Sequence, residues 1–327
     1  MFLAALAVAC YRRPIDNLDR YIYEALVRAR TQPIDAVYSI VKHESPRAEA
    51  SSVLDSPEHL RELEPLYSIR PVYLGEICFL SKIFPFQQAI TLVSAAALFG
   101  TGIMVLFWTK RPLLSGLLMA AYPMVLVGRL GTPDALAMLL IVPALWLSER
   151  HVWAPLVLLF FSLGVRTDNV LLMLAVLAWL AFDKKIPRWV ALALAVIAVG
   201  IVFCLNHWAG NYGWVVLFRF SFIAGRYPAQ IPHVLTAREY LRCLASGAAA
   251  IIDQVAVWAL IGLLAWKRQR NPLLIVVAFA AVAHFLLYPS AEDRYLVWAY
   301  VVAGTILIRS FGPSASDVSS STQRIEP

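Results

Sequence analysis

The chain has 327 residues, of which 60% are hydrophobic and only 15% are charged, and its mean hydropathy is +0.69. Soluble domains are about 45–50% apolar and about 25% charged, so this composition excludes an ordinary soluble protein and favours one that crosses a membrane several times. The net charge of +7 does not indicate nucleic-acid binding, because the basic residues stand in short turns between apolar runs rather than in one patch.

A long polar segment follows a short apolar one at the start of the chain. Residues 1–10 are apolar but too few to span a bilayer, so we expect a first transmembrane helix whose beginning is missing. Residues 11–86 are then an outer loop. It contains an amphipathic helix from residue 19 to about residue 30, and a second helix, 71–83, along the membrane interface. We expect the chemistry of the protein to involve this loop.

Apolar runs separated by polar breaks predict an all-α bundle of about ten transmembrane helices. Several runs are short for a hydrocarbon core about 30 Å thick, so flanking polar residues or local thinning must complete them. Residues 1–310 form one membrane domain, with a second outer loop at 206–245, and the Ser/Pro-rich residues 311–327 form a disordered cytoplasmic tail. After the first, the expected spans are 87–108, 113–127, 133–147, 152–165, 169–182, 187–205, 246–266, 272–288 and 294–310.

Basic residues in alternate turns predict the orientation of these spans. Because such residues are enriched in cytoplasmic turns, we expect both termini in the cytoplasm and the two long loops on the periplasmic or extracellular side. The basic turns contain Lys110 and Arg111, Arg150, Lys184, Lys185 and Arg188, and Lys267, Arg268 and Arg270.

Three turns on the outer side each place an arginine near a carboxylate: GRLGTPDA (128–135), GVRTDN (164–169) and SAEDRY (290–295). Taken singly, each is an ordinary polar cap at a helix end. Three of them on the same face as the acidic loop favour a shared site. Arginine binds phosphate oxygens in a bidentate geometry, and a carboxylate can take a proton from an attacking hydroxyl. Arg70 adds to this set, because the residue before a proline is held out of the helix and can point at a ligand.

This layout resembles the GT-C superfamily of membrane glycosyltransferases, which use polyprenyl-phosphate-linked sugars, as the lipid A aminoarabinose transferases and protein O-mannosyltransferases do. Asp16 and Asp19 are similar to the acidic residues that open the family's first loop, and since the family's Asp-Glu pair is absent, both remain candidates. The segment YSIRPVY (67–73) is similar to the basic segment that approaches the donor phosphate. TPDA (132–135), VRTDN (165–169) and DRYL (293–296) resemble the later outer turns.

The resemblance implies an inverting glycosyltransferase that moves a sugar from a polyprenyl phosphate to a hydroxyl of a lipid or glycan acceptor at the outer face. Asp19, or else Asp16, would be the general base. Arg70, with Arg166 or Arg294, would stabilise the leaving phosphate. The substrate-binding residues that the resemblance implies are Arg70, Asp134, Arg166, Asp168, Arg294 and Tyr67.

No cofactor is expected from the sequence, although Asp134 could orient the acceptor or bind a divalent metal ion. The alternative function is a transporter or flippase of a lipid-linked or small polar solute. It predicts a water-filled path through the middle of the membrane, lined by a buried Asp253 beside Gln254. The enzyme predicts instead a blind cavity at the outer face, reached from lipid by an apolar groove. A scaffold that has lost its activity is a third interpretation.

Overall fold

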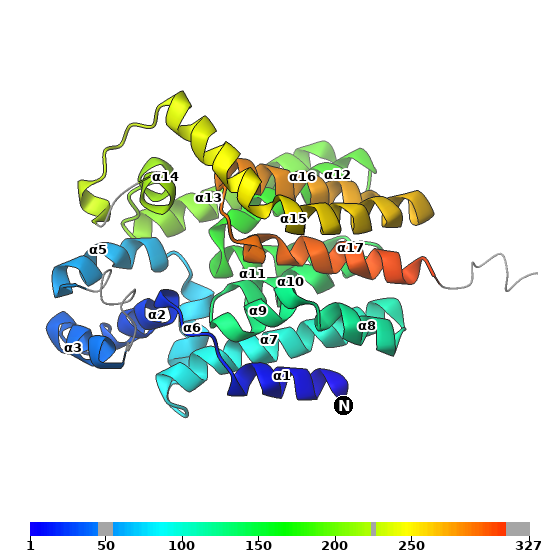
Figure 1. The fold of residues 1–327 in the computed structure, drawn as a ribbon. Helices are drawn as coiled ribbons and strands as arrows, with labels where there is room; N and C mark the ends of the chain where they lie inside the picture. The colour runs from blue at the N-terminus through cyan, green and yellow to red at the C-terminus, as the bar shows by residue number, and fades with distance from the viewer. Residues whose placement is uncertain (45–54, 224–226, 312–327) are drawn as a thin grey trace, which may run out of the picture.

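The computed structural model describes residues 1–44, 55–223 and 227–311, and these residues form helices and turns without a strand (Figure 1). The prediction of an all-helical fold is confirmed for this part of the chain. The predicted tail, 311–327, lies outside it apart from residue 311. Short helices gather at one end of the molecule, at the left of Figure 1, and we call them the cap: α2 (Leu18–Arg28), α3 (Ile34–Glu44), α5 (Pro57–Tyr67), α6 (Pro71–Leu80) and α14 (Trp214–Phe222).

The remaining helices form a bundle that extends away from the cap. Its core lies where α7 packs on α1 and α10, α10 on α11, and α15 on α17, and Val105, Ile141 and Val301 are fully buried there. The bundle contains α1 (Phe2–Arg12), α7 (Phe86–Thr109), α8 (Pro112–Met119), α9 (Tyr122–Leu130), α10 (Asp134–Leu147), α11 (Trp153–Val165), η1 (Thr167–Asn169), α12 (Val170–Phe182), α13 (Arg188–Trp208), α15 (Ala237–Gln269), α16 (Pro272–Leu287), η3 (Asp293–Leu296) and α17 (Val297–Arg309), with a 3-10 turn, η2 (Pro228–Gln230), beside the cap.

Three helices of the described chain, α7, α13 and α15, are long and apolar enough to cross a membrane, and the bent pair α8–α9 would make a fourth. The other apolar helices have 10–17 residues. A 13-residue helix such as α11 is about 20 Å long, less than a hydrocarbon core of about 30 Å. Helix length therefore does not confirm about ten spans. Large apolar side chains do point outward from α13, α15 and α16, including Phe203, Leu263 and Phe279, which is the surface expected of helices in contact with lipid.

Two predicted segments differ from the structure. The span expected at 113–127 is broken into α8 and α9, which meet at 61°, and Pro123 opens α9, where its missing N–H costs no hydrogen bond. The outer loop expected at 206–245 contains helices in its described part, namely the end of α13, all of α14 and the first turns of α15. Thr236 and Glu239 form a capping box that starts α15 at Ala237 rather than near 246.

The cap is anchored to the bundle through Arg20 of α2. This arginine is only 6% exposed, and its Nη2 donates to the Gln87 carbonyl at 3.1 Å and to the Thr91 hydroxyl at 3.0 Å, both at the start of α7. Asn17 caps α2 by accepting the Arg20 N–H at 3.2 Å. These contacts determine which side of α2 faces the bundle.

Gly131 joins α9 to the TPDA turn in a conformation that suits glycine. Its φ is +65°, in the left-handed region, and its carbonyl accepts a hydrogen bond from the Tyr73 hydroxyl at 2.8 Å. A Cβ on this residue would lie 2.7 Å from Cγ2 of Ile90 and 3.0 Å from Cγ of Arg20. Gly131 therefore allows the close approach of α9, α7 and α2 on which the position of Asp134 depends.

We predict that Gly131→Ala lowers the free energy of unfolding by about 1–2 kcal/mol, because it combines a left-handed Ala with contacts that are too short. Denaturation of the purified chain in mild detergent measures this. Gly200→Ala is the matched control, since that position lies within α13 and has no atom within 4 Å of an added Cβ. Equal stability of the two variants would contradict the role given to Gly131.

Candidate functional site

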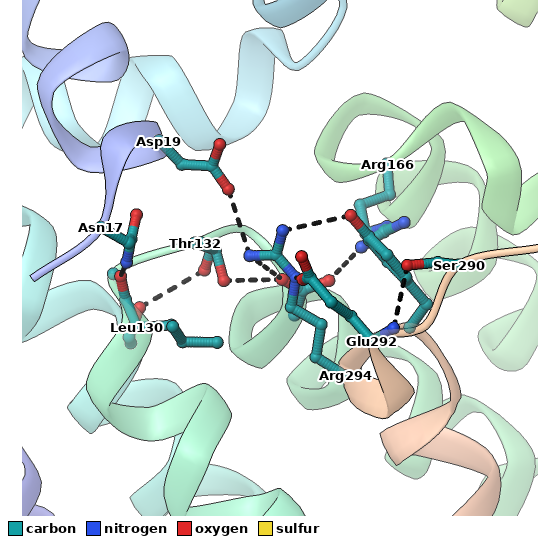
Figure 2. A network of polar contacts seen from close by, with 12 residues as sticks. Asn17, Asp19, Leu130, Thr132, Arg166, Ser290, Glu292 and Arg294 are labelled. Atoms are coloured by element: carbon teal, nitrogen blue, oxygen red, sulfur yellow. Dashed lines mark hydrogen bonds and ion pairs between the residues drawn. The ribbon is translucent and has the colours of Figure 1, made fainter. Parts of the chain in front are cut away.

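The cap and the bundle enclose a cavity of about 420 Å³, which we call the site cavity. Residues far apart in the sequence meet there, because α2, α5 and the start of α6 lie over the turns that precede α10, α12 and α17 (Figure 1). Figure 2 shows how Asp19, Arg166, Glu292 and Arg294 converge. Of the site residues predicted from the sequence, Asp19, Tyr67, Arg70, Asp134, Arg166 and Arg294 line the site cavity.

Asp19 is held by two donors from different parts of the chain. Its Oδ1 accepts the Tyr67 hydroxyl at 2.8 Å, and its Oδ2 accepts Nη1 of Arg294 at 3.1 Å. Burial by itself raises the pKa of Asp19, but Arg294, the Tyr67 hydroxyl and Arg70 outweigh burial and bring the pKa below its ordinary value. Asp19 is therefore ionised at neutral pH. Its side chain is 22% exposed and can be reached from the cavity.

Asp16, the other acidic candidate of the first loop, does not line the site cavity. Its Oδ1 accepts the Tyr21 hydroxyl at 2.7 Å, within the start of the cap. Asp16 precedes Asn17, the N-cap residue of α2, whereas Asp19 lies in the first turn of that helix. The two side chains therefore have different surroundings although they are close in sequence. Only Asp19 faces the arginines of the outer turns.

Arg166 binds two carboxylates at once. Its Nε and Nη2 donate to the Asp168 oxygens at 3.0 and 2.5 Å, and its Nη1 donates to Oδ1 of Asp134. Nε2 of His284, in α16, is 2.6 Å from Oδ2 of Asp168. Burial raises the pKa of Asp168, but Arg166 and His284 outweigh it and bring the pKa well below its usual value. Asp168 itself lies behind the site cavity and does not line it.

Arg294 connects this cluster to the cap. Besides Asp19, its Nε pairs with Glu292 (Figure 2). Its Nη1 also lies 4.0 Å from Oδ2 of Asp134, and its guanidinium stands over the Tyr295 ring at 5.0 Å. Arg166 and Arg294 thus have their charges balanced by neighbouring carboxylates. Both arginines therefore stabilise the structure of the site through ion pairs.

Arg70 is different, because no carboxylate of the described chain lies within 4.0 Å of its guanidinium nitrogens. Its Nη1 donates to the Tyr23 hydroxyl, and its guanidinium stands 5.6 and 5.4 Å from the ring centroids of Tyr23 and Tyr67. As expected from Pro71, it precedes α6 outside helical geometry, with φ −119° and ψ 58°. The site cavity therefore contains one guanidinium that forms no direct ion pair with a carboxylate of the described chain.

Two further cavities share walls with the site cavity. One, of about 270 Å³, lies against α13 and α14 and shares Arg70 and Arg166; its other walls include the apolar Leu171, Val202 and Leu287. The other, of about 430 Å³, lies between α9 and α15 and shares Asp19 and Arg294 with the site cavity. We call them the α13–α14 cavity and the α9–α15 cavity. The site is thus flanked by one space on its Arg70 side and another on its Asp19 side.

Sequence reasoning missed His284 as a member of the site. It is the only ionisable residue in the apolar run 272–287, and an ionisable group in such a run is a signal for a functional or paired residue. Tyr23 and Tyr73, which stack edge-on at 4.9 Å beside Arg70, were also outside the predicted set. Their burial depends on the packing of α2 against α6, which residue spacing alone does not indicate.

Asp253 does not occupy the position predicted for the transporter. Its side chain is exposed on α15 and lines none of the cavities described above, whereas Gln254 beside it is exposed and lines the α9–α15 cavity, so the expectation of a buried pair is wrong. Within residues 1–44, 55–223 and 227–311, no three His, Cys, Asp or Glu side chains are grouped as metal ligands would be. The polar groups of the site are mainly those of arginine, carboxylate and tyrosine side chains, together with His59 in the cavity wall and His284 behind Asp168.

Comparison of the chain with known protein families, with characterised proteins and with solved structures finds no match. The resemblance to the GT-C superfamily accordingly rests on the residues of the chain itself.

We predict that Arg166→Gln lowers the free energy of unfolding by about 3 kcal/mol at neutral pH, because it leaves the buried Asp134 and the half-buried Asp168 without their cation. The loss should shrink as the pH falls below about 4. The lowered pKa of Asp168 stabilises the wild type above the pKa of the unfolded chain, and this contribution disappears as the carboxylate is protonated. Chemical denaturation in detergent at pH 7 and below measures both effects.

Arg238→Gln is the control for that experiment, since Arg238 is exposed on α15 and lies outside the site. Its stability should follow that of the wild type at every pH. A loss in Arg166→Gln no larger than in Arg238→Gln would show that the paired carboxylates contribute nothing to folding.

Proposed function

We propose that this chain is a multi-pass membrane glycosyltransferase of the GT-C type, which transfers a sugar from a polyprenyl phosphate to an acceptor hydroxyl at the outer face of the membrane. The observation that carries the proposal is Arg70, which has no direct carboxylate partner, in the same cavity as the ionised Asp19. A half-buried guanidinium without an ion pair is a good site for phosphate, and an ionised carboxylate in the same cavity can accept a proton. One cavity thus offers both groups that the reaction requires.

The reaction is a single displacement at the anomeric carbon of the sugar. As the acceptor O–H bond breaks, its proton passes to a carboxylate oxygen of Asp19, and the acceptor oxygen forms a bond to the anomeric carbon from the face opposite the phosphate. The bond between that carbon and the phosphate oxygen breaks, and its electron pair leaves with the polyprenyl phosphate. Arg70 stabilises the charge that grows on this leaving group. Attack from the opposite face inverts the configuration of the sugar.

The two flanking cavities support separate positions for donor and acceptor. The α13–α14 cavity meets the site at Arg70 and has apolar walls next to the outward-facing Leu287 and Trp214, so it suits the first units of a prenyl chain. The α9–α15 cavity meets the site at Asp19, so it suits the acceptor whose hydroxyl Asp19 would deprotonate. This assignment keeps the phosphate and the attacking hydroxyl on opposite sides of the sugar.

The basic residues support an orientation with this site at the outer face. Lys110, Arg150 and Lys184 follow the ends of α7, α10 and α12, and Lys267 lies in the last turn of α15, whereas the site lies at the start of α10, α12 and α17. The basic ends would lie in the cytoplasm. The transporter is not proposed, because Asp253, which was expected to line its path, is exposed and lines none of the three cavities at the site.

We predict that Asp19→Asn lowers kcat by about 10²–10⁴-fold, because an amide cannot accept the proton of the acceptor. The measurement uses membranes that contain the full chain and a panel of radiolabelled polyprenyl-phosphate sugars, and counts the label that leaves the lipid. Asp16→Asn is the matched control, since it makes the same change in the same loop outside the cavity. Full activity of Asp19→Asn, or loss of activity in Asp16→Asn alone, would overturn the assignment of the base.

We also predict that Arg70→Gln weakens the binding of polyprenyl phosphate about 10- to 100-fold, because a hydrogen bond to a charged group is worth about 1.5–3 kcal/mol. Titration of the purified protein with polyprenyl phosphate, followed by native mass spectrometry, measures this without turnover. Arg238→Gln removes an exposed arginine outside the cavity and should bind like the wild type. Unchanged affinity in Arg70→Gln would remove the phosphate site from the proposal.

A further inference from the structure

A second polar cavity lies at the end of the bundle opposite the site. It has a volume of about 530 Å³ and is lined by the last residues of α7, α15 and α17 and by residues 149 and 150 after α10. In Figure 1, α15 and α17 run from the side of the cap toward this end, at the right. We call it the basal cavity. It shares no lining residue with the site cavity, so its function is a separate question.

Cations outnumber carboxylates in the basal cavity. Its charged lining residues are Lys110, Arg111, Arg150 and Arg309 with a single carboxylate, Glu149. Arg309 uses that carboxylate, since its Nη1 donates to the two Glu149 oxygens at 2.6 and 2.9 Å. No carboxylate of the described chain lies within 4.0 Å of the Lys110 amine or the Arg150 guanidinium. The cavity is therefore positively charged, with two exposed cations left to bind an anion.

Aromatic groups surround these cations in the arrangement typical of a membrane interface. Trp108 and Trp146 line the cavity, and Phe107 beside them is 59% exposed. Trp108 is itself only 4% exposed, and its indole Nε1 has no hydrogen-bond partner in the described chain. A ligand bound here would thus meet cations and an outward apolar rim at the same time.

We propose that the basal cavity binds the phosphate headgroup of an anionic phospholipid of the cytoplasmic leaflet. Lys110 and Arg150 pair with the phosphate, Trp108 lies beside the glycerol region, and the acyl chains descend along the exposed Phe107 face of α7. The apolar rim is the reason for assigning a lipid rather than a soluble phosphate. The inference requires the chain to span the membrane, but it does not depend on sugar transfer.

The test measures lipid binding to the purified full chain in detergent, with phosphatidylglycerol and phosphatidylcholine as probes. The double variant K110Q/R150Q should bind phosphatidylglycerol about 30-fold more weakly than the wild type, because each basic residue near the headgroup is worth about fivefold in affinity. K184Q/R188Q is the matched control. Lys184 and Lys110 are both exposed lysines in left-handed geometry after a helix, with φ of 57° and 56°. The control should bind like the wild type.

Three results would overturn the proposal. If both double variants lose the same affinity for phosphatidylglycerol, the lipid is attracted to basic turns in general. If the wild type binds phosphatidylglycerol and phosphatidylcholine equally well, the site does not select an anionic lipid. Displacement of phosphatidylglycerol by millimolar inorganic phosphate would indicate a soluble anion instead. If K110Q/R150Q is unstable, R150Q alone is compared with R188Q, and about fivefold weaker binding is expected. No sugar is transferred in this assay. A negative result would therefore not contradict the proposed glycosyltransferase, and loss of the glycosyltransferase proposal would not contradict lipid binding at the basal cavity.

Discussion

The pairing of Arg166 with Asp134 and Asp168 is the interaction on which the site depends. Asp134 begins α10, Asp168 lies in η1, and His284 of α16 contacts Asp168, so one guanidinium ties three helical segments together. Both carboxylates need this cation, because burial without it would cost several kcal/mol. Arg294 then extends the cluster to Asp19, and through Asp19 to the cap. The enclosure of the site cavity follows from that chain of charge pairs.

Both proposed binding sites contain basic side chains that form no ion pair with a carboxylate of the described chain. Arg166, Arg294 and Arg309 are matched by carboxylates and act in holding the bundle together. Arg70 at one end, and Lys110 and Arg150 at the other, have no such partner in the described chain. Each of these groups adjoins an apolar surface. The α13–α14 cavity adjoins Arg70, and the Phe107 face of α7 adjoins Lys110 and Arg150. Both proposals therefore concern phosphate-bearing lipids, although they place them in opposite leaflets.

Much of the helical layout could be predicted from the sequence, because long apolar runs with clear polar breaks correspond to α7, α10, α11, α12 and α16 to within a few residues. The outer turns with arginine and carboxylate were also visible, and the structure brings them together. We missed the break between α8 and α9 because a run of apolar residues does not indicate a bend. We missed the early start of α15 because the capping box at Thr236 lies in a segment that we expected to be a loop. His284 was missed because its partner is 116 residues away.

The sequence by itself determined that the chain is helical, that it is apolar enough for a membrane, and that basic turns alternate with turns carrying arginine and carboxylate. It offered Asp19, or else Asp16, as the general base, because three positions apart in a polar loop they carry the same chemistry. Only the tertiary structure separated them. Arg20 binds Gln87 and Thr91 of α7 and so sets the rotation of α2, and that rotation turns Asp19 toward Arg294 while Asp16 stays outside the cavity. The orientation of a side chain depends on contacts with residues that are distant in the sequence, and a local sequence pattern does not reveal these contacts.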